Sequence, residues 1–280
     1  MIEIKKQLIK LRELKRKIFF YIFRYPKYRF LPTPLFEHIN IQTNNRCTRR
    51  CRFCYYGILR ELPPTISMTQ GLFEKIIDEL VELNFSGRIS LYEINEPLTD
   101  PRIFDFLSMA KKKLPSAFHF LITNGDLLDA EKGEKLFKAG LDELWINCYE
   151  EDDLSRNKGI VDYFKSRGYK AKLIRNYKAE EWDSRAGNVG NYYKGKIKAP
   201  CELVYKQVIV KPDGKVSICV NDFFDKSLIG DINKQTLKEV WFGQPYEKLR
   251  RSLVKKDRSV NELCSLCDYK GYDGFVNKIK

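Results

Sequence analysis

Long apolar runs and histidine are both scarce in this sequence of 280 residues. No apolar stretch approaches the roughly 18 residues that a membrane-spanning helix needs. The N-terminus is charged from Lys5 onward and lacks the apolar core and cleavage site of a signal peptide, so we expect a cytoplasmic location. Only two histidines are present, His38 and His119, which leaves few imidazole ligands for a zinc site.

The composition is that of a globular protein, with 43% hydrophobic, 31% charged and 13% aromatic residues. The net charge of +14 is distributed unevenly, because residues 1–30 hold ten Lys or Arg against two Glu. The basicity therefore belongs to the N-terminal segment and not to a face spread over the whole protein. We expect no nucleic-acid partner.

The basic N-terminal segment, residues 2–23, is predicted to be a helix, followed by a stretch containing Pro26, Pro32 and Pro34. Apolar residues recur at helical spacing at Ile4, Leu8, Leu11, Leu14, Ile18 and Ile22. One interpretation is a helix docked on the domain by this stripe. The other is a surface helix attracted to acidic lipid headgroups, a carrier protein or another acidic partner.

Strands and helices alternate from His38 onward. Strands are predicted at 38–42, 88–93, 117–123, 143–149 and 169–175, and helices at 69–84, 101–113, 129–139 and 154–167. Such alternation indicates parallel strands with crossover helices. Because five strands cannot close an eight-stranded barrel, we predict an α/β fold with a partial, open TIM barrel of about five to six parallel strands.

The alternation stops near Asn176, and a linker is predicted at 187–200. A β-hairpin at 207–219 turns at Pro212-Asp213-Gly214, and helices follow at 236–242 and about 245–256. We divide the chain into an N-terminal helix and linker (1–35), the partial barrel (36–186) and a small C-terminal module (187–280). The module has little apolar material, so a metal centre would supply missing stabilisation.

Seven of the eight cysteines fall into two groups, Cys47, Cys51 and Cys54 early, and Cys201, Cys219, Cys264 and Cys267 late. In a reducing compartment this favours metal or iron–sulfur ligation over disulfides. Three thiolates could hold three irons of a [4Fe–4S] cube and leave the fourth open, and neighbouring arginines would favour thiolate. Four thiolates suit a closed cluster site, with closed zinc as the alternative.

Cys47-x3-Cys51-x2-Cys54 after the first strand, with Phe53 before the third cysteine, resembles the radical S-adenosylmethionine (SAM) superfamily. The resemblance extends to Ile94-Asn95-Glu96-Pro97, where the family has Gly-Gly-Glu-Pro, to Thr123-Asn124-Gly125, and to Asn147. It implies that Phe53, Asn95, Glu96, Thr123, Asn124 and Asn147 contact SAM. Glu96 would supply the carboxylate for the SAM amino group, although the two glycines are missing.

The resemblance implies a definite chemistry. The SAM amine and carboxylate chelate the unique iron, reductive cleavage yields a 5′-deoxyadenosyl radical, and this radical abstracts a substrate hydrogen. The electron would come from a low-potential donor, flavodoxin or ferredoxin.

The late cysteines resemble the shorter, Twitch type of SPASM module, which carries one auxiliary [4Fe–4S] cluster. The expected cofactors are therefore SAM and two [4Fe–4S] clusters. Overall the chain is similar to aminocyclitol dehydrogenases and to SPASM enzymes that modify carbohydrates or peptides.

Two arginines are candidate anion contacts. Arg175 ends the fifth predicted strand, and Arg185 lies in a stretch, 183–187, that resembles one preceding SPASM modules. Either could bind the SAM carboxylate or a substrate anion, or pair with a surface carboxylate. The eighth cysteine, Cys148, could donate hydrogen to a radical, but strand alternation points it away from Asn147 and favours a buried structural thiol.

A closed auxiliary cluster favours electron transfer, and hence oxidation of a sugar or cyclitol alcohol. The alternative is a maturase that crosslinks or epimerises a ribosomally made peptide. A non-catalytic iron–sulfur electron carrier is the competing class, but it would need neither Glu96 nor the Thr123-Asn124-Gly125 turn.

Overall fold

The fold is organised around one continuous eight-stranded sheet with strand order β5-β4-β3-β2-β1-β6-β7-β8. The computed structural model describes residues 7, 11, 14–175, 184–190 and 195–269. Six strands are parallel: β1 (His38–Ile41), β2 (Arg88–Ser90), β3 (Phe118–Thr123), β4 (Glu143–Cys148), β5 (Ala171–Arg175) and β6 (Gln207–Val210). The predicted open barrel of parallel strands is confirmed.

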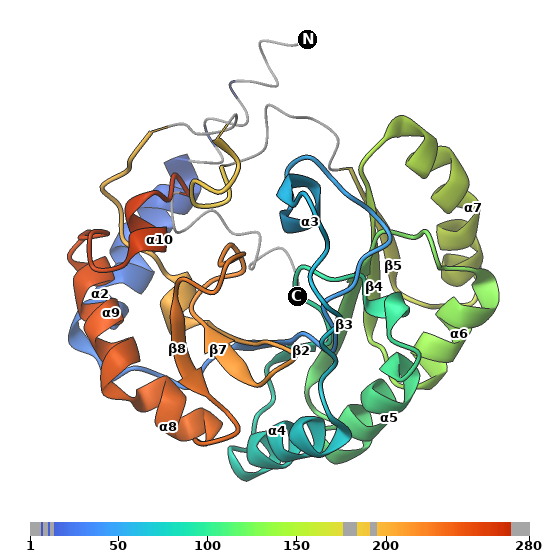
Figure 1. The fold of residues 1–280 in the computed structure, drawn as a ribbon, viewed down its shortest axis with the longest axis horizontal. Coiled ribbons are helices and arrows are strands. Elements are labelled where there is room, and N and C mark those ends of the chain that lie inside the picture. Colours follow the sequence, from blue (N-terminus) through green and yellow to red (C-terminus); the bar gives the residue numbers. More distant parts are fainter. Residues whose placement is uncertain (1–6, 8–10, 12–13, 176–183, 191–194, 270–280) are drawn as a thin grey trace.

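Helices cover the outer face of the curved sheet (Figure 1). On the barrel half these are α4 (Gln70–Glu82), α5 (Ile103–Lys113), α6 (Ala130–Lys138) and α7 (Glu151–Ser166), and on the other half α8 (Leu237–Phe242) and α9 (Gln244–Val254). The Thr69 hydroxyl accepts from Leu72 N–H and caps α4, and Asp129 caps α6 in the same way. The short elements are α3 (Tyr55–Ile58), η2 (Pro97–Thr99), η5 (Leu203–Tyr205) and α10 (Glu262–Ser265).

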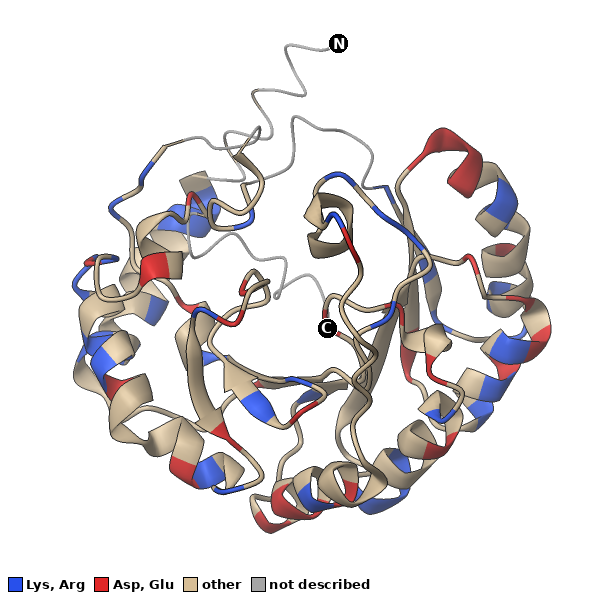
Figure 2. Cartoon of the chain, viewed as in Figure 1, with Lys and Arg blue, Asp and Glu red and all other residues tan. Residues whose placement is uncertain are grey.

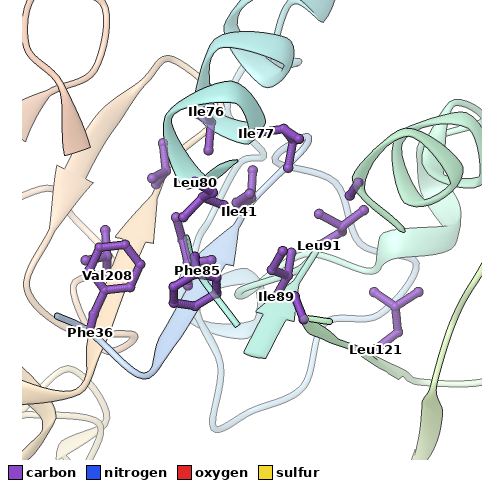
Figure 3. Packing of buried hydrophobic residues seen from close by; sticks show 14 of the residues in the cluster. Phe36, Ile41, Ile76, Ile77, Leu80, Phe85, Ile89, Leu91, Leu121 and Val208 are labelled. Atoms are coloured by element: carbon purple, nitrogen blue, oxygen red, sulfur yellow. The ribbon is translucent and has the colours of Figure 1, made fainter. Parts of the chain in front are cut away.

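The core lies between the sheet and the outer helices. Ile76, Ile77 and Leu80 of α4 face strand residues such as Ile41 and Ile89 (Figure 3). Alternation turns every second side chain, such as Asn40 between Ile39 and Ile41, to the inner face. The inner face therefore carries polar groups such as Asn40 together with a second, smaller apolar cluster of Phe120, Ile122 and Trp145.

The C-terminal hairpin is part of the barrel sheet. Strand β6 pairs in parallel with β1, from His38 opposite Gln207 to Ile41 opposite Val210. Two antiparallel strands extend it, β7 (Lys215–Ser217) and β8 (Leu228–Asp231), and β8 was not predicted from the sequence. The division at residue 187 thus separates two strands that are hydrogen-bonded neighbours.

The N-terminal helix differs from its prediction. It is helical over 14–19, widens into a π-helical turn (Phe20–Arg24), and continues as α2 (Tyr25–Phe30), beyond the predicted end. Pro26 does not end it, because a proline in the first turn of α2 has no N–H to leave unpaired. Among the described residues, no helix combines the length and the apolar content that crossing a bilayer requires.

Candidate active site

The first three cysteines lie in the loop between β1 and α3. Cys54 N–H donates to the Cys51 carbonyl at 2.9 Å, which closes a turn between these two residues. Burial raises the pKa of Cys47 to about 11 and of Cys51 to about 12. The Cys54 thiol further raises the pKa of both, and the Cys47 thiol further raises the pKa of Cys51. The three thiols therefore lie near one another in a largely buried site. They would lose their protons on binding an iron–sulfur cluster.

Arg49 has a different role from the one its position suggested. Its guanidinium forms ion pairs with Asp126 and with Asp153, at 2.7 Å to Asp153 Oδ2. These carboxylates follow β3 and lie in α7. Arg49 still lowers the pKa of Cys51, but less than burial raises it. Its main effect is to hold the cysteine loop on two neighbouring strand ends.

Glu96 connects the second and third strand ends to this loop. Its carboxylate accepts from the Thr123 hydroxyl at 2.7 Å and from Asn124 N–H at 2.8 Å. The Asn124 amide in turn donates to Thr48 Oγ1 at 2.9 Å and lies 3.8 Å from Cys47 Sγ. Burial raises the pKa of Glu96 to about 7, although both hydrogen bonds lower it.

The other predicted SAM contacts divide into two groups. Phe53 is buried and its ring lies 5.3 Å from that of Tyr149, whose hydroxyl accepts from the Asn147 amide at 3.0 Å. The Asn95 side chain, in contrast, bonds to Asn44 and to Glu93 N–H and so shapes the turn itself. The structure brings Phe53 and Asn147 together beside the cysteine loop.

Arg175 and Cys148 are opposite each other in the register of β4 and β5. Cys148 is fully buried and interacts with Asn157 of α7, so its side chain faces the helices. Paired residues of parallel strands point to the same face, so Arg175 is directed away from the face that carries Asn147. The structure does not bring Arg175 to the cysteine loop.

Arg185 does approach the loop. Its guanidinium lies 6.0 Å from the centre of the Phe53 ring and lowers the pKa of Cys54, which burial raises more strongly. Arg185, Ala186 and Gly187 all have positive φ, at 51°, 57° and 84°. Two successive non-glycine residues in this region are strained and persist only where surrounding contacts fix them.

Those contacts come from the late cysteine segments. Ser184 donates to the Asp268 carboxylate through its hydroxyl at 2.8 Å, and the Asn188 amide donates to the Asn221 carbonyl at 2.7 Å. Asp268 follows Cys267 directly. Residues 184–189, which we name the bridging segment, therefore connect the early cysteine loop with the late cysteines.

The four late cysteines line one cavity, together with Ala186 and apolar side chains such as Ile218 and Leu253. Burial raises the pKa of Cys201 to about 11 and of Cys264 to about 12. Among the described residues, no three His, Cys, Asp or Glu side chains lie close enough to hold a single ion. Four cysteines around one cavity are an all-thiolate donor set, which fits a closed iron–sulfur cluster site.

Comparison with known proteins decides the family. A family model described as the radical SAM superfamily matches residues 41–181. The chain belongs to the radical SAM superfamily. A second model, SPASM, described as an iron–sulfur cluster-binding domain, matches residues 201–268. This radical SAM enzyme therefore uses SAM and a [4Fe–4S] cluster, and its SPASM domain implies additional iron–sulfur clusters, as predicted.

Individual relatives are similar over most of the chain. The S-adenosyl-L-methionine-dependent 2-deoxy-scyllo-inosamine dehydrogenase of Niallia circulans is 24% identical over 235 residues, 84% of this chain and 93% of the relative. The crystal structure of BtrN in complex with AdoMet and 2-DOIA gives a TM-score of 0.74 at 23% identity, covering 85% of this chain and 95% of BtrN. The crystal structure of BtrN in an open conformation gives a TM-score of 0.67 at 22% identity, covering 86% of this chain and 99% of BtrN.

A half-buried acidic group beside the radical SAM loop was missed by sequence reasoning. Glu93 follows β2, and burial raises its pKa to about 8, while Lys211 lowers it. Lys211 follows β6, donates to the Asp222 carbonyl at 2.8 Å and pairs with Asp225. Glu93 in turn raises the pKa of Cys54. We call Glu93, Lys211 and Asp225 the polar triad.

The signal for Glu93 was its position at a strand end, two residues before Asn95. Lys211 could not be found in this way, because the predicted hairpin at 207–219 placed it only next to the turn at Pro212-Asp213-Gly214. Only the parallel pairing of β6 with β1 makes it a C-terminal strand end of the barrel. Such ends are where barrel active sites assemble.

Proposed function

We propose that this radical SAM enzyme is a dehydrogenase that oxidises a hydroxyl group of a small polar substrate, a sugar or aminocyclitol. When bound, SAM and the first cluster supply the radical that removes a substrate hydrogen, and the SPASM cluster supplies an acceptor for the second electron. The observation that carries the proposal is the bridging segment, because it contacts both cysteine groups. The similarity to the 2-deoxy-scyllo-inosamine dehydrogenase of Niallia circulans supports the same reaction.

In this proposal the chain's own residues position SAM. Glu96 would accept a hydrogen bond from the amino group of bound SAM. Thr123 and Asn124 hold the Glu96 carboxylate in place for this contact. Asn147 of β4 reaches Phe53 of the loop through Tyr149, and Arg185 approaches Phe53 from the bridging segment. Together with Cys47, Cys51 and Cys54, these are the residues we assign to the radical-forming site.

The polar triad holds the substrate. Glu93 lies beside Cys54, and Lys211 lies beside Glu93. A substrate with several hydroxyl or amino groups offers both donors and acceptors to them. Tyr55 covers one side of the mouth, with ring contacts to Phe223 at 6.0 Å and to Phe224 at 5.8 Å. These rings exclude water from the reacting carbon.

The test uses the anaerobically reconstituted enzyme with both cysteine groups loaded, a low-potential electron donor, and a panel of aminocyclitols and sugars that includes 2-deoxy-scyllo-inosamine. We expect 5′-deoxyadenosine and ketone in equal amounts. Cys201→Ala is expected to keep the first cluster and cleave SAM but to form little ketone. Full ketone formation by this variant would refute the role of the second cluster.

The peptide alternative makes a different prediction for the same assay. A maturase would show no substrate-stimulated SAM cleavage with any cyclitol or sugar, but stimulation by a short peptide encoded beside its gene. That outcome would replace the dehydrogenase proposal. A fully loaded protein that cleaves no SAM at all would contradict both.

A further inference from the structure

One segment takes no part in the proposed reaction, the helix over 14–30. It is fixed to the body of the protein by one face. Phe20 is buried, Tyr28 stacks on Tyr205 with ring centres 4.4 Å apart, Tyr25 donates to the Val254 carbonyl at 2.9 Å, and Arg24 pairs with Glu202 at 3.1 Å. These contacts determine which face of the helix is left outside.

The outward face is strongly apolar. The exposed fraction is 59% for Ile22, 56% for Phe23, 73% for Phe30 and 60% for Leu31. We define the N-terminal apolar stripe as the large exposed apolar residues of this segment: Leu11, Leu14, Ile18, Phe19, Ile22, Phe23, Phe30 and Leu31. Since the opposite face is already docked, the helix cannot bury this stripe by rolling. The stripe therefore requires a partner outside the described chain, because large clustered apolar side chains are rarely left in water.

Within the helix over 14–30 the charged side chains are all of one sign. Lysine and arginine occur at Lys15, Arg16, Lys17, Arg24, Lys27 and Arg29, and no aspartate or glutamate lies between Glu13 and Glu37. Helix α9 packs against α2, and it is followed by Lys255 and Lys256. The Lys256 ammonium lies 5.5 Å from the Tyr21 ring. Lysine and arginine recur along α2 and α9 (Figure 2).

Apolar and aromatic side chains interleaved with cations, on a fixed helix, match a membrane interface. The apolar groups can enter the boundary between headgroups and acyl chains while lysine and arginine stay at the phosphates. A second copy of this chain would bring the same positive charge to the same face, which disfavours self-association there. We propose that the N-terminal apolar stripe docks this enzyme peripherally on an anionic lipid surface.

The test is co-sedimentation of the full, cluster-loaded enzyme with vesicles of phosphatidylcholine containing about one third phosphatidylglycerol. We expect the enzyme to bind these anionic vesicles at least tenfold more tightly than vesicles of pure phosphatidylcholine. Binding to the anionic vesicles should weaken when salt is raised from about 0.1 M to about 0.5 M. The double variant Ile22→Ser/Phe23→Ser should weaken binding at least tenfold, and Lys27→Glu/Arg29→Glu should abolish the preference for anionic lipid.

The matched control is Val81→Ser/Tyr163→Ser, which removes two exposed apolar side chains elsewhere, of 41% and 39% exposure, and should bind like the wild type. Iron content and circular dichroism must be unchanged in each variant. Absence of vesicle binding by the wild type, or unchanged binding by Ile22→Ser/Phe23→Ser, overturns the proposal. A dimer that the wild type forms and Ile22→Ser/Phe23→Ser does not form would also overturn the proposal, because the stripe would then contact a second copy.

Discussion

Glu93 combines a half-buried carboxyl group with a lysine from the other half of the chain. If the polar triad holds the substrate, Glu93→Gln removes the carboxylate that forms above the Glu93 pKa of about 8, while the amide keeps the shape. Measured above pH 8, kcat/KM for the substrate should fall roughly ten- to a hundredfold, as for loss of one charge-assisted hydrogen bond of about 1.5–3 kcal/mol. SAM cleavage without substrate should persist.

The control for this measurement is Glu131→Gln, an exposed carboxylate in the first turn of α6. It should leave both rates unchanged. An unaltered kcat/KM in Glu93→Gln would show that the substrate lies elsewhere.

His38 predicts how the fold responds to acid. Burial lowers its pKa to about 3, with further lowering by Arg88 and Lys206, and the half-exposed Glu37 carboxylate 3.9 Å away does not offset this. In the unfolded state His38 has its ordinary pKa of 6.5, so below that pH it binds a proton that it does not bind in the folded state. This effect is absent above pH 6.5 and lowers the free energy of unfolding as the pH falls toward 3, by at most about 1.4 kcal/mol per pH unit.

Urea unfolding at neutral pH and about one unit below pH 6.5, under anaerobic conditions, checks this. His38→Gln is expected to be less stable at neutral pH but to lose less stability on acidification than the wild type. Parallel losses in the two proteins would rule out His38 as the acid-sensitive group.

At the scale of elements, the cysteine loop depends on a single glycine. A Cβ on Gly57 would lie 2.0 Å from the Cys51 carbonyl oxygen, which is backbone and cannot rotate away. Gly57→Ala should therefore displace Cys51 or Cys54 and prevent loading of the first cluster, while the second group still binds iron. Iron content should fall by about half, with loss of SAM cleavage.

Gly71→Ala in α4 is the matched control, because nothing lies within 4 Å of its added Cβ. It should keep full iron content and be slightly more stable, since alanine favours the helix. Full loading of Gly57→Ala would mean that the loop rearranges on binding its cluster.

The sequence predicted those elements whose signals are local. Helices were predicted from residues 69 and 129, and Thr69 and Asp129 are the residues that cap α4 and α6. The early cysteines follow the first strand, as predicted. The failures depend on distant contacts. The helix continues past Pro26, and contacts of Tyr28 with Tyr205 and of Arg24 with Glu202 hold it on the body of the protein. Lys211 reaches the site only because β6 pairs with β1, which no local pattern indicates.

For the whole molecule, sheet continuity predicts that the chain does not divide at residue 187. A fragment 1–186 would lose β6 from one edge of β1 and would expose Phe36, whose ring packs against Trp241 at 5.3 Å. We expect the fragments 1–186 and 187–280 to be insoluble alone and to assemble when co-expressed. Solubility and circular dichroism of each fragment check this, and a natively folded 1–186 would establish independent domains.

The pairing of β1 with β6 also sets an order in time. At about 5–20 residues per second, β6 leaves the ribosome on the order of ten seconds after β1. The loop with Cys47, Cys51 and Cys54 follows β1 directly, whereas Cys201 precedes β6 and Cys267 ends the second group. During synthesis the radical-forming site therefore presents its thiols while β1 still has an open edge, and the auxiliary site becomes complete only after β8 has been made, when Cys264 and Cys267 emerge.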